Sequence, residues 1–293
     1  MNKALITNLI SGEYTLYDLE TKETFLAKPR GIFRNGKQNI KVGDYCEYEK
    51  ESPFSIITKI MPRKTDLIRP AIANVDQAIV VTSLKEPDLN LNLLDRFLAI
   101  LEYNDIFTLL IFTKPDLLND NEKEATSPIV SYYQQIGYDT FIVSNKEKIL
   151  TDTIKLYLKN KISVVIGQSG VGKSSFLNLI NEEYHLQTNA ISKALNRGKH
   201  TTRYTVLLPY EEGWLADSPG FGALDMSDFD EQKLSQSFKE FFEMASKCKY
   251  NGCIHLSEPG CFVKEEVKKN HILRSRYDNY IQLLGEIKNK RKW

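Results

Sequence analysis

The sequence predicts a multidomain α/β protein, and three changes of pattern along the chain support this fold class. Residues 1–65 contain short alternating runs rich in tyrosine, threonine and isoleucine. Residues 66–225 alternate strand-like and helical segments, and residues 226–293 are helical and basic. These patterns are typical of a small barrel, a parallel sheet covered by helices, and a helical domain. We therefore expect three domains with these bounds.

The first segment predicts an antiparallel β-barrel. Turn-forming residues such as Gly12 and Pro53 separate short strand-like runs, namely ALITNLI, EYTLYDL, TFLAKP, DYCEYE and FSIITKI. About five strands in about 65 residues fit an OB-like barrel, although an SH3-like barrel would give much the same pattern. Cys46 lies in the fourth run, and we expect it to be part of the barrel wall.

The middle segment predicts a parallel sheet with helices on both faces. The strand-like runs QAIVVTS, FTLLIFT, TFIVS and ISVVIG alternate with helical segments, namely LNLLDRFLAILEY, one near Ile129–Ile136 and one over Ile149–Leu158. YTVLLP and GWLAD add two further strands. After Asp228 we expect an amphipathic helix at FKEFFEMASK and one long helix over Val263–Lys290.

Composition limits the class of protein. The 293 residues are 42% hydrophobic and 26% charged, with a net charge of +1, which is ordinary for a globular protein and argues against a disordered chain. No apolar run reaches the roughly 18 residues that a membrane-spanning helix needs. A glycine and a glutamate soon interrupt the N-terminal apolar stretch, so we expect no signal peptide. We expect a cytoplasmic monomer with no membrane partner.

The strongest motif is GQSGVGKS, which fits the phosphate-loop pattern G-x-x-x-x-G-K-[ST] between a buried strand and a helix start. Glycines let backbone N–H groups surround a polyanion, Lys173 places a cation on the β- and γ-phosphates, and the Ser174 hydroxyl suits Mg²⁺. The competing explanation is a glycine-rich turn with an accidental lysine. The candidate nucleotide-binding residues here are Gly167, Gln168, Ser169, Gly170, Val171, Gly172, Lys173, Ser174 and Ser175.

A guanine-reading loop is predicted at TKPD, at the end of the strand FTLLIFT. Asp116 would accept hydrogen bonds from guanine N1–H and the 2-amino group, which adenine cannot offer together, and the Lys114 stem would lie along the base. Thr113 stands where most GTPases have asparagine, so we expect weaker or different support of this loop. Ser144 and Asn145, after the strand TFIVS, would form a second base-contacting loop.

Two downstream motifs predict the switch regions. LADSPG contains D-x-x-G, in which Asp217 would hold Mg²⁺ through water and the Gly220 N–H would meet the γ-phosphate. GKHTT lies in a polar segment, and Thr201 or Thr202, with a slight preference for Thr202, would reach Mg²⁺. The motifs therefore run base, base, phosphate, switch, switch (G4-G5-G1-G2-G3). Ordinary GTPases begin with the phosphate loop, so this order predicts a circular permutation.

A cysteine and histidine cluster predicts a structural zinc site. The spacing C-x₄-C-x-H-x₅-C brings three thiolates and one imidazole together, a set that suits closed tetrahedral zinc. The alternative is a group of buried free thiols beside a surface histidine. The ligands would be Cys248, Cys253, His255 and Cys261, whereas we assign no role to His185 or His271.

The chain resembles the RsgA (YjeQ/YloQ) family of circularly permuted GTPases, which mature the small ribosomal subunit. The resemblance rests on RPAIANVDQAIVV, LNLLDRFL, TKPD, GQSGVGKSS, GKHTT, DSPGF and the Cys/His cluster, and it spans nearly the whole length. It implies an OB-fold, a permuted GTPase domain and a C-terminal zinc domain. It also implies GTP and GDP as ligands, Mg²⁺ and one Zn²⁺ as cofactors, and the small ribosomal subunit with its rRNA as partner.

Hydrolysis is expected to need a partner. Phe221 follows D-x-x-G, where Ras-like enzymes have a glutamine that orients the attacking water, so we expect slow intrinsic turnover. His200 is the nearest candidate for that task, although an exposed switch residue or an RNA contact explains it about equally well. Three functions remain open: a ribosome-assembly GTPase, a nucleotide-gated RNA-binding module with incidental hydrolysis, and an ATP-using phosphate-loop enzyme.

Basic residues at both ends of the chain predict an RNA-binding surface, although each set could also be a solvated face. The N-terminal set has the aromatic residues Phe33 and Tyr45 nearby in sequence. Its members are Arg30, Arg34, Lys37, Lys41, Arg63 and Lys64. The C-terminal set comprises Arg274, Arg276, Lys288, Lys290, Arg291 and Lys292.

Overall fold

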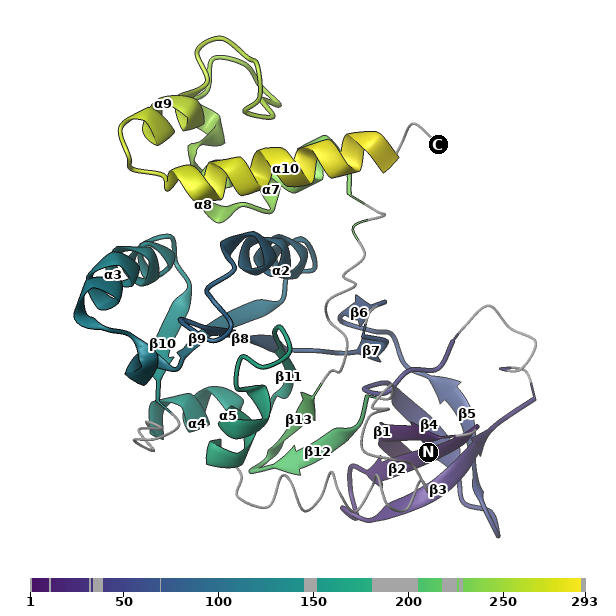
Figure 1. Ribbon diagram of the computed structural model, residues 1–293. Helices are drawn as coiled ribbons and strands as arrows, with labels where there is room; N and C mark the ends of the chain where they lie inside the picture. The colour runs from purple at the N-terminus through teal and green to yellow at the C-terminus, as the bar shows by residue number, and fades with distance from the viewer. Residues whose placement is uncertain are drawn as a thin grey trace. The chain divides into compact units, whose positions relative to one another are not determined.

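The computed structural model describes residues 2–10, 12–31, 33, 39–68, 70–144, 152–180, 205–217, 226 and 229–290 (Figure 1). The chain forms two compact units. One comprises residues 1–78, 150–166 and 173–223, and the other comprises residues 79–149, 167–172 and 224–293. The expected division at residues 65 and 225 stays a prediction, and each compact unit is described by itself below.

The first unit contains the predicted barrel, which is closed and has the strand order β1-β2-β3-β5-β4. The strands are β1 (Asn2–Ile10), β2 (Glu13–Asp18), β3 (Thr24–Pro29), β4 (Tyr45–Glu49) and β5 (Ser55–Ile60). Strands β3 and β5 pair in parallel, whereas the other neighbours are antiparallel. This arrangement confirms the OB-like barrel. Its core includes the buried side chains of Ile6, Leu16, Cys46 and Ile57, so Cys46 belongs to the wall as expected.

The remainder of the first unit carries three strands of the sheet. Strand β11 pairs in parallel with β13, and β12 pairs with β13 in the antiparallel direction. Tyr17 of the barrel contacts Trp214 of β13 edge to face, with ring centroids 4.9 Å apart. The elements are β6 (Asp66–Leu67), β7 (Ile72–Ala73), α4 (Asp152–Leu158), β11 (Ile162–Ile166), α5 (Lys173–Ile180), β12 (Leu207–Tyr210) and β13 (Gly213–Asp217).

The second unit begins within β8 and contains the strand order β10-β9-β8, with β10 parallel to β9. Helix α3 begins earlier than the predicted Ile129–Ile136. Its first turns are polar and exposed, so they lack the apolar period, but Asn119 and Glu122 form a capping box at its start. The elements are β8 (Gln77–Ser83), α2 (Leu91–Tyr103), β9 (Phe107–Thr113), η1 (Pro115–Leu117), α3 (Asp120–Gln135) and β10 (Asp139–Val143).

The C-terminal part of the second unit is helical, but the single long helix predicted over Val263–Lys290 is wrong. Asn270 has φ 60°, and the backbone N–H groups of His271 and Ile272 both donate to the carbonyl of Glu266, which ends the helix. Two helices result. The elements are α7 (Glu231–Gln236), α8 (Lys239–Met244), η3 (Ala245–Lys247), α9 (Phe262–Lys268) and α10 (Arg274–Lys290).

A buried ionic network joins α10 to α2 and α8 within this unit. The Arg276 guanidinium is fully buried and donates to Asp95 Oδ1 at 2.6 Å and to Glu240 Oε1 at 2.8 Å. The hydroxyl of Tyr133 and the amide of Asn279 also donate to Asp95, each at 2.6 Å. Arg276 is therefore an internal structural residue, and its predicted place on an RNA-binding surface is wrong.

Within the residues described, no helix combines the length and the apolar character that crossing a bilayer requires.

Candidate functional site

The phosphate loop lies against strand β8. A Cβ atom on Gly167 would come within 2.1 Å of the Val81 carbonyl oxygen, so this position has no room for a side chain. Gly170 and Gly172 also have positive φ values, 82° and 97°. Backbone of this kind turns N–H groups into a concave surface that suits an anion. The local geometry is thus what a polyphosphate site requires.

The predicted base-reading loop contacts the phosphate loop directly. The buried Thr113 hydroxyl donates to the Val171 carbonyl at 2.6 Å. The Lys114 ammonium donates to the Gly170 carbonyl at 2.8 Å and also contacts the Glu86 carbonyl. Thr113 therefore does anchor the loop, through a hydroxyl in place of the usual amide. Segments 58 residues apart in sequence meet at this hydrogen bond.

Asp116 and Ser144, from the two predicted base loops, lie side by side. Asp116 is exposed, whereas Ser144 is buried at the end of β10. The Ser144 hydroxyl donates to Asp116 Oδ1 at 3.3 Å, which helps to orient the carboxylate. An oriented, accessible carboxylate beside a phosphate site is the arrangement expected for recognition of guanine N1–H and its 2-amino group.

The β8–α2 loop also contacts the predicted base-reading loop, which the sequence did not indicate. Its Glu86 carbonyl accepts a hydrogen bond from Lys114, and its Lys85 forms a two-armed ion pair with Glu122, with both distances 2.8 Å. Gln168 of the phosphate loop lines a small cavity together with Asn90 and the first turns of α2. The dipeptide Glu86-Pro87 is the one local sequence signal that could have marked this loop.

The other predicted site residues lie in the first unit or outside the described residues. Lys173, Ser174 and Ser175 begin α5 in the first unit, and Asp217 ends β13 without a described side chain. The remaining positions lie outside the described residues: Asn145, His185, His200, Thr201, Thr202, Gly220 and Phe221.

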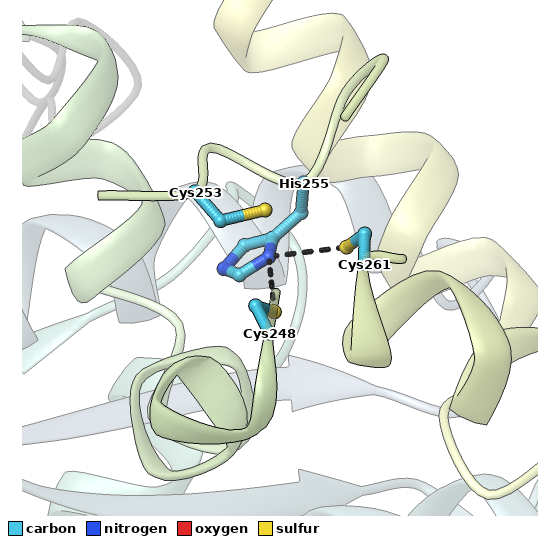
Figure 2. A group of neighbouring side chains, drawn as sticks. All are labelled: Cys248, Cys253, His255 and Cys261. Carbon is cyan, nitrogen blue, oxygen red and sulfur yellow. Dashed lines mark hydrogen bonds between the residues drawn. The ribbon is translucent and has the colours of Figure 1, made fainter. Parts of the chain in front are cut away.

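The predicted metal ligands converge in the second unit (Figure 2). The candidate ligand atoms of Cys248, Cys253, His255 and Cys261 all lie within 4.8 Å of one another. His255 Nδ1 is 3.7 Å from Cys248 Sγ and 3.4 Å from Cys261 Sγ. Two ligands of one tetrahedral zinc ion lie about 3.3–3.8 Å apart, so the two nitrogen–sulfur distances fit a single bound ion.

The electrostatics of the cluster also suit a metal. Burial raises the pKa of Cys253 and raises that of Cys261 to about 12, so these thiols are neutral without a cation. Burial lowers the pKa of His255, which favours the neutral imidazole that binds metal. A zinc ion would supply the positive charge that thiolates need in this environment. The residues present therefore fit zinc.

The predicted N-terminal basic surface is smaller than the sequence suggested. Arg63 donates to both carboxylate oxygens of the fully buried Asp44 and to Asp66, while Lys41 pairs with Asp66. Both residues form ion pairs that link the barrel to Asp66 in the segment after it, so their assignment to a free basic surface is wrong. Phe33 packs partly against the barrel core. Arg30 and Lys64 are exposed, and Lys64 pairs with Asp76 at 2.9 Å.

The C-terminal basic set also changes. Arg274 is exposed and pairs with Asp278, and Lys288 is partly exposed and pairs with Glu231 at 3.4 Å. The side chain of Lys290, together with Arg291 and Lys292, lies outside the described residues, as do Arg34 and Lys37 of the N-terminal set.

The order and contacts of these loops define a class of protein. A TKPD motif that precedes the phosphate-loop motif in sequence, and is hydrogen-bonded to it, is typical of a circularly permuted phosphate-loop GTPase.

Comparison with known proteins then identifies the family. A family model described as RsgA GTPase matches residues 60–227. The small ribosomal subunit biogenesis GTPase RsgA of Shouchella clausii is 43% identical over 100% of this chain and 99% of its own length. The protein of the same name from Bacillus subtilis is 41% identical over 99% of each chain. This chain belongs to the RsgA GTPase family, and it is a GTP-hydrolysing enzyme.

Solved structures agree over nearly the whole chain. The crystal structure of YloQ, a circularly permuted GTPase, is 36% identical with a TM-score of 0.82, covering 98% of this chain and 95% of that one. YjeQ from Thermotoga maritima is 34% identical with a TM-score of 0.84, covering 98% of both chains. The predicted permutation is thereby confirmed.

Proposed function

We propose that this protein acts in late maturation of the small ribosomal subunit and hydrolyses GTP to GDP and phosphate with turnover stimulated by that subunit. The observation that carries the nucleotide part is the hydrogen bonding of Thr113 and Lys114 to the phosphate loop, which holds Asp116 close to a polyphosphate site. The full-length relatives named small ribosomal subunit biogenesis GTPases support the ribosomal part.

The phosphate end of GTP would be bound by the loop Gly167–Gly172 and by Lys173, whose charge offsets that of the β- and γ-phosphates. Ser174 and Thr202 would ligate Mg²⁺, and Asp217 would hold it through water. Ser175, in the first turn of the helix after the loop, would also contact the nucleotide phosphates. When bound, Mg²⁺ neutralises charge on the phosphate oxygens. The Gly220 amide would contact the γ-phosphate.

The base end would be read by Asp116, which accepts from guanine N1–H and the 2-amino group. The Ser144 hydroxyl, 3.3 Å from Asp116 Oδ1, orients that carboxylate, and Asn145 would complete the second base loop. The Lys114 ammonium bonds to the carbonyls of Gly170 and Glu86, so its stem can lie under the base while its charge fixes the neighbouring loops.

The hydrolytic step would wait for the ribosomal partner. Phe221 has no group that could orient water, so His200 in the switch is our candidate for that task. Binding of the small subunit would order the switch, as partner proteins do for other GTPases. The enzyme would work as a cytoplasmic monomer, with one structural Zn²⁺ at the Cys/His cluster.

The rRNA contacts would come from the exposed basic residues that remain after the corrections above. Arg30 and Lys64 on the barrel side and Arg274 on α10 are exposed. Arg34, Lys37 and Lys290–Lys292 extend the two sets. Phosphate contacts of this kind predict binding that weakens steeply as salt rises, and salt-insensitive binding to the subunit would contradict the assignment.

The decisive experiment is multiple-turnover hydrolysis of GTP with and without small ribosomal subunits. We expect a rise in turnover of about tenfold or more on the subunit, because the partner completes the catalytic site. Equal turnover, together with nucleotide-dependent binding to the subunit, would favour the alternative of a nucleotide-gated rRNA-binding module with incidental hydrolysis. His200→Ala should remove the stimulation while GTP binding persists.

Base specificity has its own test. Asp116→Asn should weaken GTP binding by at least about 100-fold and move the preference toward xanthosine triphosphate, because xanthine offers a carbonyl where guanine offers an amino group. Asp120→Asn is the matched control, since Asp120 is 99% exposed and pairs only loosely with Lys123 at 3.2 Å. Unchanged GTP preference in Asp116→Asn would refute the assignment.

A further inference from the structure

The turn that carries two of the metal ligands has an unusual backbone. Cys253 and His255 lie two residues apart, and His255 has φ 57°, in the left-handed region. That region is uncommon for residues other than glycine, although histidine adopts it more often than most, so contacts with the surroundings help to hold His255 there. The side chain of His255 nevertheless points toward Cys248 and Cys261 (Figure 2). Hydrogen bonds with Glu258 and with α10 add to the stability of this turn.

Glu258 provides one set of contacts. Its Oε1 accepts a hydrogen bond from the backbone N–H of Ile254, and its Oε2 accepts one from the N–H of Leu256, each at 2.8 Å. These two amides flank His255 on either side. A single carboxylate thus fixes the Cys253–Ile254 and His255–Leu256 peptide units, through charge-assisted hydrogen bonds that are stronger than neutral ones.

Helix α10 provides a second set from different groups. The Tyr277 hydroxyl donates to the carbonyl of His255 at 2.8 Å, and the Tyr280 hydroxyl donates to the carbonyl of Ile254 at 2.5 Å. The N–H groups of Ile254 and Leu256 therefore bond to Glu258, while the carbonyls of Ile254 and His255 bond to α10. In the peptide unit between His255 and Leu256, both the carbonyl and the N–H are hydrogen-bonded in this way.

We propose that Glu258 is a positioning residue for the metal site: it holds the Cys253–His255 turn in the conformation that presents His255 Nδ1 to the metal. The proposal rests on the zinc assignment made above. Among the described residues, the converging ligand group comprises the three thiols and the imidazole, so Glu258 does not itself belong to it. Its effect is preorganisation, because a turn already held in the bound conformation loses less entropy when the ion binds.

The test compares two neutral variants of the full-length protein. Glu258→Gln keeps the side-chain size but leaves one acceptor oxygen and places an amide group against the second N–H. Glu265→Gln is the matched control, because Glu265 is exposed on α9, four residues after the ligand Cys261. Zinc affinity is measured by competition with a chromophoric chelator, and Co²⁺ absorption reports the coordination of the site.

Glu258→Gln should bind zinc about 10–100-fold more weakly than wild type, the usual effect of removing an outer-shell partner, while Glu265→Gln stays within about twofold. Tyr277→Phe should give a smaller loss, and the Co²⁺ spectrum at saturation should remain tetrahedral in all variants. Equal zinc affinity of the two glutamine variants would overturn the proposal.

Two further outcomes are informative. If Glu258→Gln lacks native far-UV circular dichroism even at saturating zinc, the residue serves the fold in general and the positioning role is overturned. If wild type binds no stoichiometric zinc or cobalt, the zinc assignment itself fails, which is distinguishable from equal affinities of the variants.

Discussion

Replacing Arg276 by methionine tests the buried ionic network that joins α10 to α2 and α8. The substitution keeps a long, flexible side chain but removes the donors to Asp95 Oδ1 and Glu240 Oε1, at 2.6 and 2.8 Å. Arg276 and Asp95 are both 0% exposed, and Glu240 is 3% exposed. Two carboxylates would thus be left in a nonpolar interior without their cation.

The expected loss follows from the partners that remain. Breaking a buried ion pair typically costs about 3–5 kcal/mol, because a charge stays buried without compensation. Asp95 keeps the Tyr133 hydroxyl and the Asn279 amide, and Glu240 keeps the Tyr132 hydroxyl at 3.2 Å. The cost should therefore fall at the lower end, about 3 kcal/mol, which lowers the melting temperature of a unit of this size by roughly 6–12 °C.

The assay is thermal and urea unfolding followed by circular dichroism. Arg274→Met is the matched control, since the Arg274 side chain is 73% exposed and pairs only with Asp278 on the same helix, which should be worth under about 1 kcal/mol. Adding Asp95→Asn to Arg276→Met should cost less than the sum of the single changes, because it removes the uncompensated charge. An Arg276→Met variant as stable as Arg274→Met would refute the reasoning.

Three other predictions concern separate parts of the molecule. Thr113→Val removes the hydrogen bond to Val171 and should weaken GDP binding by about 1 kcal/mol, or roughly fivefold, measured by titration calorimetry; Thr108→Val on the same strand is the control and should bind normally. The Tyr48 hydroxyl and backbone amides lower the pKa of Asp18 to about 2 against the opposing effect of burial, so its stabilisation is present above pH 4 and lost as pH falls from 4 to 2. Wild type should consequently lose more stability than Asp18→Asn over that window in urea titrations, and parallel pH profiles would contradict this. Chelating the metal should unfold the C-terminal helices, and an unchanged far-UV spectrum in metal-free protein would argue against a structural site.

The sheet strands could be predicted from sequence because buried strands consist mainly of apolar residues. QAIVVTS, FTLLIFT and GWLAD correspond residue for residue to β8, β9 and β13. A strand buried on both faces is mainly apolar, so a short apolar run closely marks its position. The phosphate-loop motif and the convergence of the three cysteines with His255 could be predicted for a related reason, since the chemistry proposed for them needs fixed residue types at fixed spacing.

Helix limits and charge partners were harder to predict. The start of α3 is polar and exposed, and the sequence prediction missed it, although its capping residues Asn119 and Glu122 could have marked it. Arg276 looked like a surface residue because its partner Asp95 is 181 residues away in sequence, and no local pattern shows that pairing. Arg63 and Lys41 were misjudged in the same way, since the carboxylates that hold them lie in other segments.

Consecutive positions on α10 connect two features that the sequence presented as separate. Arg276 bonds to Asp95 of α2, and the next residue, Tyr277, bonds to His255 of the metal-binding turn. A second ion pair, Arg96 with Glu286 at 2.6 Å, also joins α2 to α10. Because one rigid helix makes both sets of contacts, loss of the metal-binding turn removes support from the helix that packs on α2. A zinc ion at the Cys/His cluster, as proposed, would thus stabilise the same compact unit that contains Gly167–Gly172 and Thr113–Asp116.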